Sequence, residues 1–159
     1  KVVELRDLFP TFLDVADGSD QVPLGINGSS LLNILRPDDV HKKPWRQWID
    51  LEHSTCYNAT NHWNALTDGE IKYIYQAFSG DEQLFNLAVD PMELNNLAGD
   101  AHHSNTLMTW RNRMIRQFLD EGRGEDWTKR SSSGKVELRK RTQPMTYSPY
   151  YPKNDFAKF

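Results

Sequence analysis

The sequence predicts an α+β fold, in which a small antiparallel sheet of about four strands packs against a long C-terminal helix. Two observations support this class. Residues 45–86 contain four short segments with strand composition, separated by turn sequences. Residues 104–121 repeat apolar side chains every three or four positions, as an amphipathic helix does. Sequential strands with short turns favour an antiparallel meander, and the long helix is expected to cover one face of it.

A first helix is predicted at residues 4–16. Asp7 is expected to cap it, and Pro10 then lies in the first turn, where no amide donor is needed. Gly18 fits the exit of this helix. A loop rich in turn residues follows, and a short apolar helix is expected at residues 30–35. The helical spacing of residues 4–16 comes from Leu5, Leu8, Phe9, Phe12, Leu13 and Ala16.

The sheet is predicted from alternating residues and from two turns. Asp68-Gly69 is a strong hairpin signal, because this dipeptide favours the tight turns that join antiparallel strands. A second turn is expected at Ser79-Gly80-Asp81. The predicted strands are residues 45–52, 63–67, 70–78 and 83–86.

The segment after the last predicted strand reads DPMELNNL. Asp90 is placed as a helix N-cap, with Pro91 at the first helical position and Glu93 completing a capping box. Val89 and Leu94 then have the spacing of a hydrophobic staple. The segment is therefore predicted to join a strand to a helical turn, and it is assigned no chemical role.

The long helix is expected to be capped by Ser104 or Asn105 and to end at Gly122. Residues 122–159 are polar and basic, and they predict an extended tail with one strand at KVELR. The buried face of the helix is predicted from Leu107, Met108, Trp110, Met114, Ile115, Phe118 and Leu119. Its solvated face is predicted from Arg111, Asn112, Arg113, Arg116 and Asp120, and the tail anchors are Trp127, Tyr147, Tyr150 and Tyr151.

Composition excludes several classes of function. The net charge of −3 and the pI of about 5.9 argue against nucleic acid as a partner, because phosphate binding needs a basic face. The sequence has no apolar run near the roughly 20 residues that span a bilayer, so no membrane span is expected. With one cysteine, Cys56, neither an internal disulfide nor a cysteine-rich zinc site is expected.

Several motifs together resemble the sulfatase family of the alkaline phosphatase superfamily. VELRDLFPTFLDVAD resembles a conserved helix of that family, and PLGINGSSLL resembles the loop that follows it. Further on, IKYI, then SGDEQLF, then DPMELNNL resemble the family's C-terminal strand, turn and joint. The resemblance covers about residues 3–98, in the family's order, and the RGEDW and YSPYYP segments are similar to one arylsulfatase-like branch.

The resemblance implies which parts of the enzyme are present. Sulfatases use a formylglycine, made from the Cys or Ser of a C/S-x-P-x-R motif, together with a calcium ion. No such motif occurs in this sequence, and Cys56 has neither the Pro nor the Arg at the required spacing. Calcium and formylglycine are therefore expected in a preceding catalytic domain. Residues 1–36 are expected to end that α/β domain and to include a helix that belongs to it, residues 37–121 to form the C-terminal subdomain, and residues 122–159 the tail.

The family also implies candidate substrate contacts at the end of the sheet. Loops of the C-terminal subdomain can border the substrate pocket in related sulfatases. His53 ends a predicted strand and enters such a loop, and the next strand begins close by. The substrate-contact candidates are therefore His53, Asn61, His62 and Trp63, against the simpler interpretation that they are polar residues at a hairpin end.

Other chemistry-bearing residues have simpler interpretations. Glu52 and His53 have no third partner at metal-ligand spacing. His102-His103 precede the long helix and are expected to be exposed, and Cys56 has no neighbouring base that would activate a nucleophile. Lys72 is expected to be a solvated strand residue. No catalytic or metal-ligating residue is therefore assigned in this chain.

Two classes of function are compared. In the first, the chain is an inactive C-terminal part of a sulfatase that cleaves aryl or carbohydrate sulfate esters, with a phosphodiester or phosphonate as the alternative ester. In the second, it is a free-standing binding or structural module, which would bury Leu5, Phe9 and Phe12 within itself, whereas a part of a larger enzyme exposes them. The partners expected are a sulfated small molecule or glycan, and the preceding catalytic domain or a second copy held through the N-terminal helix. The family also implies a periplasmic or secreted location.

Overall fold

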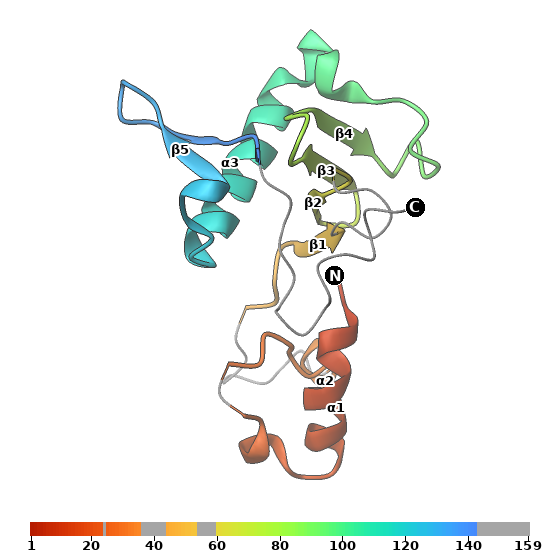
Figure 1. Cartoon of the computed structure of the whole chain (residues 1–159). Coiled ribbons are helices and arrows are strands. Elements are labelled where there is room, and N and C mark those ends of the chain that lie inside the picture. Colours follow the sequence, from red (N-terminus) through yellow and green to blue (C-terminus); the bar gives the residue numbers. More distant parts are fainter. Residues whose placement is uncertain (24, 36–43, 54–59, 143–159) are drawn as a thin grey trace, which may run out of the picture. The chain divides into compact units, whose positions relative to one another are not determined.

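The structure is a computed structural model that describes residues 1–23, 25–35, 44–53 and 60–142, and it divides the chain into two compact units, Lys1–Ile49 and Asp50–Phe159 (Figure 1). The first predicted domain border, after residue 36, falls where the described residues break off. The three predicted domain ranges stay predictions. Within the described residues, no helix is long and apolar enough to cross a membrane.

The first unit is organised around α1 (Leu8–Val15), which follows a 3-10 turn at Leu5–Asp7. These elements confirm the helix predicted at residues 4–16, and α2 (Leu32–Leu35) confirms the short helix after the loop. The exit of α1 differs in detail from the prediction. The left-handed residue is Asp17, with φ 57°, whereas Gly18 donates its amide to the Leu13 carbonyl at 2.8 Å.

Asp7 does not cap α1 with its side chain, so that prediction was wrong. Its carboxylate is fully buried and accepts hydrogen bonds from the Glu4 and Ser29 amides, both at 2.9 Å. Two guanidinium nitrogens of Arg46 also donate to it, each at 2.6 Å. Burial raises the pKa of Asp7, but the bonds from Arg46, Ser29 and Glu4 outweigh it and leave the pKa below its usual value. Asp7 is thus the centre of the first unit.

Residues 45–48 are not part of a strand, because β1 begins only at Ile49. Two of their side chains are used within the first unit instead. The Trp45 indole donates to the Val2 carbonyl at 2.7 Å, and Arg46 binds Asp7. The backbone of Gly28 also passes so close to the Arg6 carbonyl that a β-carbon there would lie 1.9 Å from its oxygen. The conformation of residues 45–48 is therefore determined by tertiary contacts, which a strand pattern in the sequence does not encode.

The second unit contains the predicted antiparallel meander, with strand order β1-β2-β3-β4. The strands are β1 (Ile49–His53), β2 (Trp63–Thr67), β3 (Ile71–Gln76) and β4 (Glu82–Asn86). The register places Leu66, Tyr73 and Leu84 side by side across three strands, and all three are fully buried. Gly69 adopts φ 93° in the predicted Asp68-Gly69 turn.

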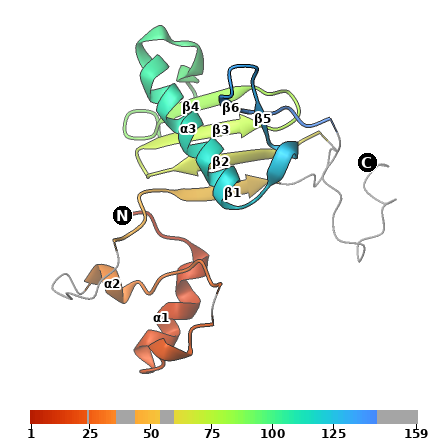
Figure 2. The ribbon, with the colours of Figure 1, turned by 90° about the vertical axis from the view of Figure 1, so that its left-hand side faces the viewer.

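The long helix α3 (Ser104–Asp120) lies across the sheet (Figure 2). Its buried residues are Trp110, Met114, Ile115 and Phe118, which were four of the predicted apolar positions. Met108 and Leu119 are about half exposed. The N-cap position is His103 and makes no side-chain cap, so the cap predicted at Ser104 or Asn105 was wrong. The predicted fold class, a small antiparallel sheet packed against a long helix, is confirmed.

The Asp90 joint is not a helix start. Glu93 has φ 55°, which is outside the helical region, and its carboxylate binds the Lys72 ammonium at 2.8 Å and not the Asp90 amide. Asp90 accepts instead from the Leu94 and Asn95 amides, at 3.1 and 2.8 Å. The predicted staple is absent as well, since Val89 is 79% exposed and Leu94 78%. A closed turn and an ion pair therefore fasten this segment to β3.

The described part of the tail contains more structure than the extended chain that was predicted. Gly122, with φ 66°, ends α3 as expected, and a 3-10 turn at Gly124–Asp126 follows. The KVELR strand is β6 (Val136–Leu138), but it pairs with an unpredicted strand, β5 (Thr128–Arg130). Residues 143–159, with the three tyrosine anchors, lie outside the described residues.

Candidate functional site

Three of the four predicted contact residues meet at the end of the sheet where β1 finishes and β2 begins. The rings of His53 and Trp63 stack, with centroids 5.6 Å apart and planes 14° from parallel. The His53 Nδ1–H donates to the Asn61 carbonyl at 3.1 Å, so Nε2 of the neutral ring is an acceptor, and no partner for it is found among the described residues. His53 and Trp63 are partly exposed and Asn61 is exposed. This arrangement forms a flat surface with one available ring nitrogen.

His62, the fourth candidate, lies inside the unit. Its ring has no exposed surface, and its Nε2 contacts the Glu52 carboxylate at 2.9 Å. The ring also meets Trp127 edge to face, with centroids 4.8 Å apart. The structure therefore separates His62 from the other three candidates, and its neighbours indicate a role in holding Glu52 and Trp127.

Glu52 is the link between the sheet and the segment after α3. Its second oxygen accepts from Arg123 at 2.9 Å, and Arg123 also binds Glu121. The hydrogen bond from His62 lowers the pKa of Glu52 to about 2, helped by Arg123 and opposed by partial burial. We call the residues His62, Glu52, Arg123 and Trp127 the Glu52 cluster.

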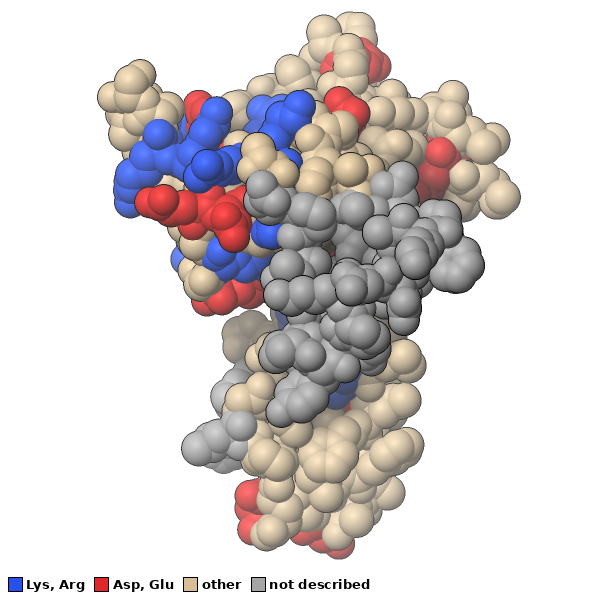
Figure 3. All heavy atoms as spheres, viewed as in Figure 1, with Lys and Arg blue, Asp and Glu red and all other residues tan. Residues whose placement is uncertain are grey.

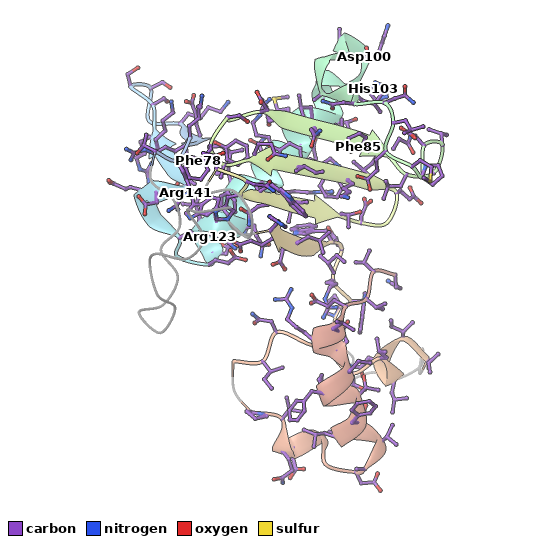
Figure 4. All side chains as sticks on the ribbon, turned by 45° about the vertical axis from the view of Figure 1, so that its right-hand side comes forward. Phe78, Phe85, Asp100, His103, Arg123 and Arg141 are labelled. Carbon is purple, nitrogen blue, oxygen red and sulfur yellow. The ribbon has the colours of Figure 1, made fainter. Side chains whose placement is uncertain are left out.

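Two guanidinium groups lie near the ring of Trp127. The Arg123 guanidinium is 5.1 Å from the Trp127 ring centroid, and the Arg141 guanidinium is 4.8 Å from it. Both arginines lie at one end of the unit, opposite Asp100 and His103 (Figure 4). Such cation–π contacts stabilise most where the ring is desolvated, and Trp127 is nearly fully buried. Trp127 thereby confirms its predicted role as an anchor.

Sequence reasoning missed most of this cluster. Glu52 and Arg123 are 71 positions apart, and no spacing rule pairs residues at that distance. The one usable signal was Trp127, an aromatic residue in an otherwise polar segment. Glu52 itself was considered only as a metal ligand.

A second, partly buried network corrects the prediction that Arg111 is only a solvated residue. Arg111 binds both oxygens of Glu82, at 2.7 and 2.5 Å, and the Tyr73 hydroxyl donates to the same carboxylate at 2.5 Å. Burial, together with the Glu82 charge, raises the pKa of Tyr73 well above its usual range, so the hydroxyl stays protonated. The arginine thus ties α3 to β4 beside the buried Tyr73.

Comparison with known proteins places the chain among sulfatases. A scan against models of protein families finds no match. The chain is 33% identical over 128 residues to an arylsulfatase of Clostridium perfringens, covering 80% of this chain and 24% of that protein. It is 37% identical over 103 residues to mouse arylsulfatase K, covering 61% of this chain and 18% of that protein. The chain thus spans a quarter or less of the curated relatives it matches.

Solved structures give the same result. A 2-O GAG sulfatase superposes with a TM-score of 0.62 and 25% identity, over 83% of this chain and 27% of that one. The chain therefore carries the sequence and fold of the sulfatase family. The phosphonate monoester hydrolase of Agrobacterium radiobacter also shares the fold, with a TM-score of 0.52 and 22% identity over 84% of this chain and 28% of that one.

The described residues of this sulfatase-family chain include no group of three or more His, Cys, Asp and Glu side chains that could hold a metal ion. His102 and His103 are used at the start of α3, where Asp100 accepts from the His102 amide at 2.9 Å and contacts the His103 ring at 3.1 Å. Lys72 is paired with Glu93, which corrects its prediction as a solvated residue. Cys56 lies outside the described residues.

The low pKa of Glu52 predicts a pH-dependent contribution to stability. The pKa of Glu52 is about 2 in the folded chain, against an ordinary value of 4.5. Its contribution to the free energy of unfolding is therefore complete above pH 4.5 and is lost as the pH falls toward 2. Glu52→Gln is expected to lower the free energy of unfolding by about 1.5–3 kcal/mol at pH 7, because it removes the charged acceptor. Denaturant unfolding at pH 7, 4 and 3 measures the effect. The gap between variant and wild type should shrink with acid, and the exposed Glu70→Gln should show no gap. A gap that stays constant with pH contradicts the assignment.

Proposed function

We propose that this chain is a non-catalytic part of an enzyme that hydrolyses sulfate esters of aryl or carbohydrate substrates. The observation that carries the proposal is the 33% identity over 128 residues to an arylsulfatase. The fold shared with a 2-O GAG sulfatase supports a carbohydrate substrate. The sequence contains no C/S-x-P-x-R motif that could supply a formylglycine, and its described residues do not fit a calcium site. The reacting groups are therefore proposed to come from another part of the enzyme.

The exposed face of α1 supports a part of a larger enzyme over a free-standing module. On α1, Phe12 is 66% exposed and Phe9 is nearly half exposed, and Leu5 on the preceding 3-10 turn is 84% exposed. A free-standing module is expected to bury these side chains, because exposed apolar patches usually mark a contact surface. We propose that the catalytic domain of the same polypeptide covers this face.

The end of the sheet is proposed to border the substrate. The stacked pair of His53 and Trp63 offers a planar face for an aryl ring or a sugar ring, and His53 Nε2 can accept a hydrogen bond from a sugar hydroxyl. Asn61, whose backbone carbonyl binds His53, is exposed. Buried His62 is proposed to support this end of the sheet through Glu52 and not to touch the substrate.

The alternative function is hydrolysis of a phosphonate or phosphodiester by the same fold. The specific observation in its favour is the fold shared with a phosphonate monoester hydrolase. Sulfate, phosphonate and phosphodiester groups differ in charge and geometry, and the catalytic residues select among them. An activity measurement on each ester therefore separates the two functions.

The test compares this chain with a polypeptide extended by the upstream reading frame, matured for formylglycine and supplied with calcium. The extended protein should hydrolyse 4-nitrophenyl sulfate faster than 4-nitrophenyl phenylphosphonate, and this chain alone should hydrolyse neither. In the extended protein, His53→Ala should change the ranking of kcat/KM across sulfated sugars, whereas His102→Ala should not. Turnover by this chain that survives controls for contaminating sulfatase overturns the proposal, as does a preference for the phosphonate. An unchanged ranking removes His53 from the site.

A further inference from the structure

The segment that contains the β5–β6 hairpin is strongly basic, although the chain as a whole is acidic. Residues 122–142 hold seven Lys and Arg against three Asp and Glu, a net charge of +4, whereas the whole chain has −3. Lys and Arg side chains gather over this hairpin on the surface (Figure 3). A concentrated positive field on an acidic protein favours an anionic partner at this surface.

Most of these cations have no carboxylate partner within the described residues. Arg130 and Arg139 donate to the Gly134 and Glu125 carbonyls, at 3.4 and 3.0 Å, which fixes their guanidinium groups without neutralising them. Lys135 and Lys140 form no ion pair in the described part of the chain. We call Arg130, Lys135, Arg139 and Lys140 the hairpin cations. They differ from Arg123 and Lys129, which pair with Glu52 and Glu137.

The hairpin cations line two hollows on the surface. One, of about 290 Å³, lies between α3 and β6 and includes Lys135 and Lys140, together with the ion pair of Arg111 and Glu82. The other, of about 490 Å³, lies beside β5 and includes Arg130 and Arg139. Val136 lines both, so the hairpin forms a wall with positive charge on either side. An extended polymer with repeated negative groups can contact cations on both sides of this wall.

The other lining groups favour a sulfated sugar chain over nucleic acid. The 290 Å³ hollow also contains the Asn112 amide and the Glu137 carboxylate, both of which can bond sugar hydroxyl groups. Its one aromatic residue, Tyr75, is almost completely buried and offers no face for a stacked base. The mixture of cations, amide and carboxylate suits a polymer that carries both sulfates and hydroxyls.

We propose that the β5–β6 hairpin binds a sulfated polysaccharide through the hairpin cations. The proposal rests on the proposed function, because it makes the substrate a polymer that this surface holds. The proposed interaction involves no catalytic step, so a binding measurement alone tests it. Loss of this binding would leave hydrolysis of a small aryl sulfate intact, which keeps the two proposals distinguishable.

The experiment measures binding of the purified chain to heparin and dextran sulfate by titration calorimetry and by salt elution from heparin resin. Replacing the four hairpin cations together with glutamine should weaken binding at least tenfold at 0.15 M salt. It should also lower the slope of log K against log salt by about one for each contact removed. Lys135→Gln with Lys140→Gln should give an intermediate loss without disturbing the two hydrogen-bonded arginines. Arg113→Gln with Arg116→Gln, on α3, makes the same charge change elsewhere and should alter binding less than twofold.

Several results would overturn the proposal. These are no saturable binding by the wild-type chain, an equal loss in the α3 control, and equal binding to uncharged dextran. Equal affinity for single-stranded DNA or for phosphatidylserine vesicles would also reject a sulfated polysaccharide as the specific ligand. Thermal unfolding of each variant, compared with wild type, shows whether a loss reflects binding or folding.

Discussion

Replacing Asp7 with alanine is expected to destabilise residues 1–49 by about 3–5 kcal/mol, which is a large part of the stability of a unit this small. The carboxylate is fully buried and accepts four hydrogen bonds, two from Arg46 and one each from the Glu4 and Ser29 amides. Removing it leaves two amides without their acceptor and leaves the mostly buried Arg46 guanidinium with only longer contacts, to Glu4 at 3.6 Å and to the Asn27 carbonyl at 3.5 Å. Hydrogen exchange resolved by peptide measures the loss, because the two compact units can be followed separately.

The controls for Asp7 lie in the same unit. Asp20→Ala removes an exposed carboxylate and should leave exchange unchanged. A cycle with Arg46→Ala should show a coupling of 0.5–3 kcal/mol, because residues that share one network are not additive. Since the pKa of Asp7 is lowered, its contribution should also fade as the pH drops below 3.8, its ordinary value. Unchanged protection of residues 1–49 in the alanine variant would refute this account.

Local signals predicted the sheet and the long helix because those signals are strong and short-range. The Asp68-Gly69 turn fixes the register of β2 and β3, and that register decides which face of each strand is buried. In α3, four apolar residues at helical spacing suffice to define the buried face. These elements depend little on distant parts of the chain, so the pattern was enough.

Predictions failed where a distant side chain competed with a local rule. Glu93 has the spacing of a capping box, but Lys72 on β3 binds it and the backbone closes into a turn. Asp7 has the position of an N-cap, yet Arg46, 39 residues away, draws it into the core. Arg111 lies on the predicted solvated face and is held by Glu82. In each case a charge pair formed by tertiary folding outweighed a capping or solvation preference of about 1 kcal/mol.

The candidate site shows the same division. The family resemblance selected His53, Asn61, His62 and Trp63 as substrate-contact candidates, and the structure brings His53, Asn61 and Trp63 together. The support of that site, from Arg123 and Trp127 through Glu52 and His62, involves partners far apart in the sequence. No pattern within a single segment reports such contacts, so these partners were missed, and substrate contact by His53, Asn61 and Trp63 stays a prediction.

Trp127→Ala is expected to cost about 3–5 kcal/mol and to detach the β5–β6 hairpin from the sheet. The indole packs on Phe118 of α3 at 4.9 Å between centroids and meets His62 at 4.8 Å. The backbone carbonyl of Trp127 also accepts a hydrogen bond from the Arg139 amide at 2.8 Å, just after β6 ends. Removing the ring leaves a cavity between helix, sheet and hairpin, and it exposes the Glu52 cluster to water.

The loss of stability in Trp127→Ala should be confined to the hairpin, so hydrogen exchange resolved by segment tests the prediction most directly. Hydrogen exchange should increase first in residues 124–139, whereas β2, β3 and β4 keep most of their protection, because their own pairing is intact. Trp127→Phe keeps an aromatic face against Phe118 and His62 and should recover at least half of the lost stability. If the hairpin presents the cations for a sulfated polysaccharide, the alanine variant should also bind heparin more weakly with every cation still present. Equal exchange rates in the hairpin of variant and wild type would show that the indole is not its anchor.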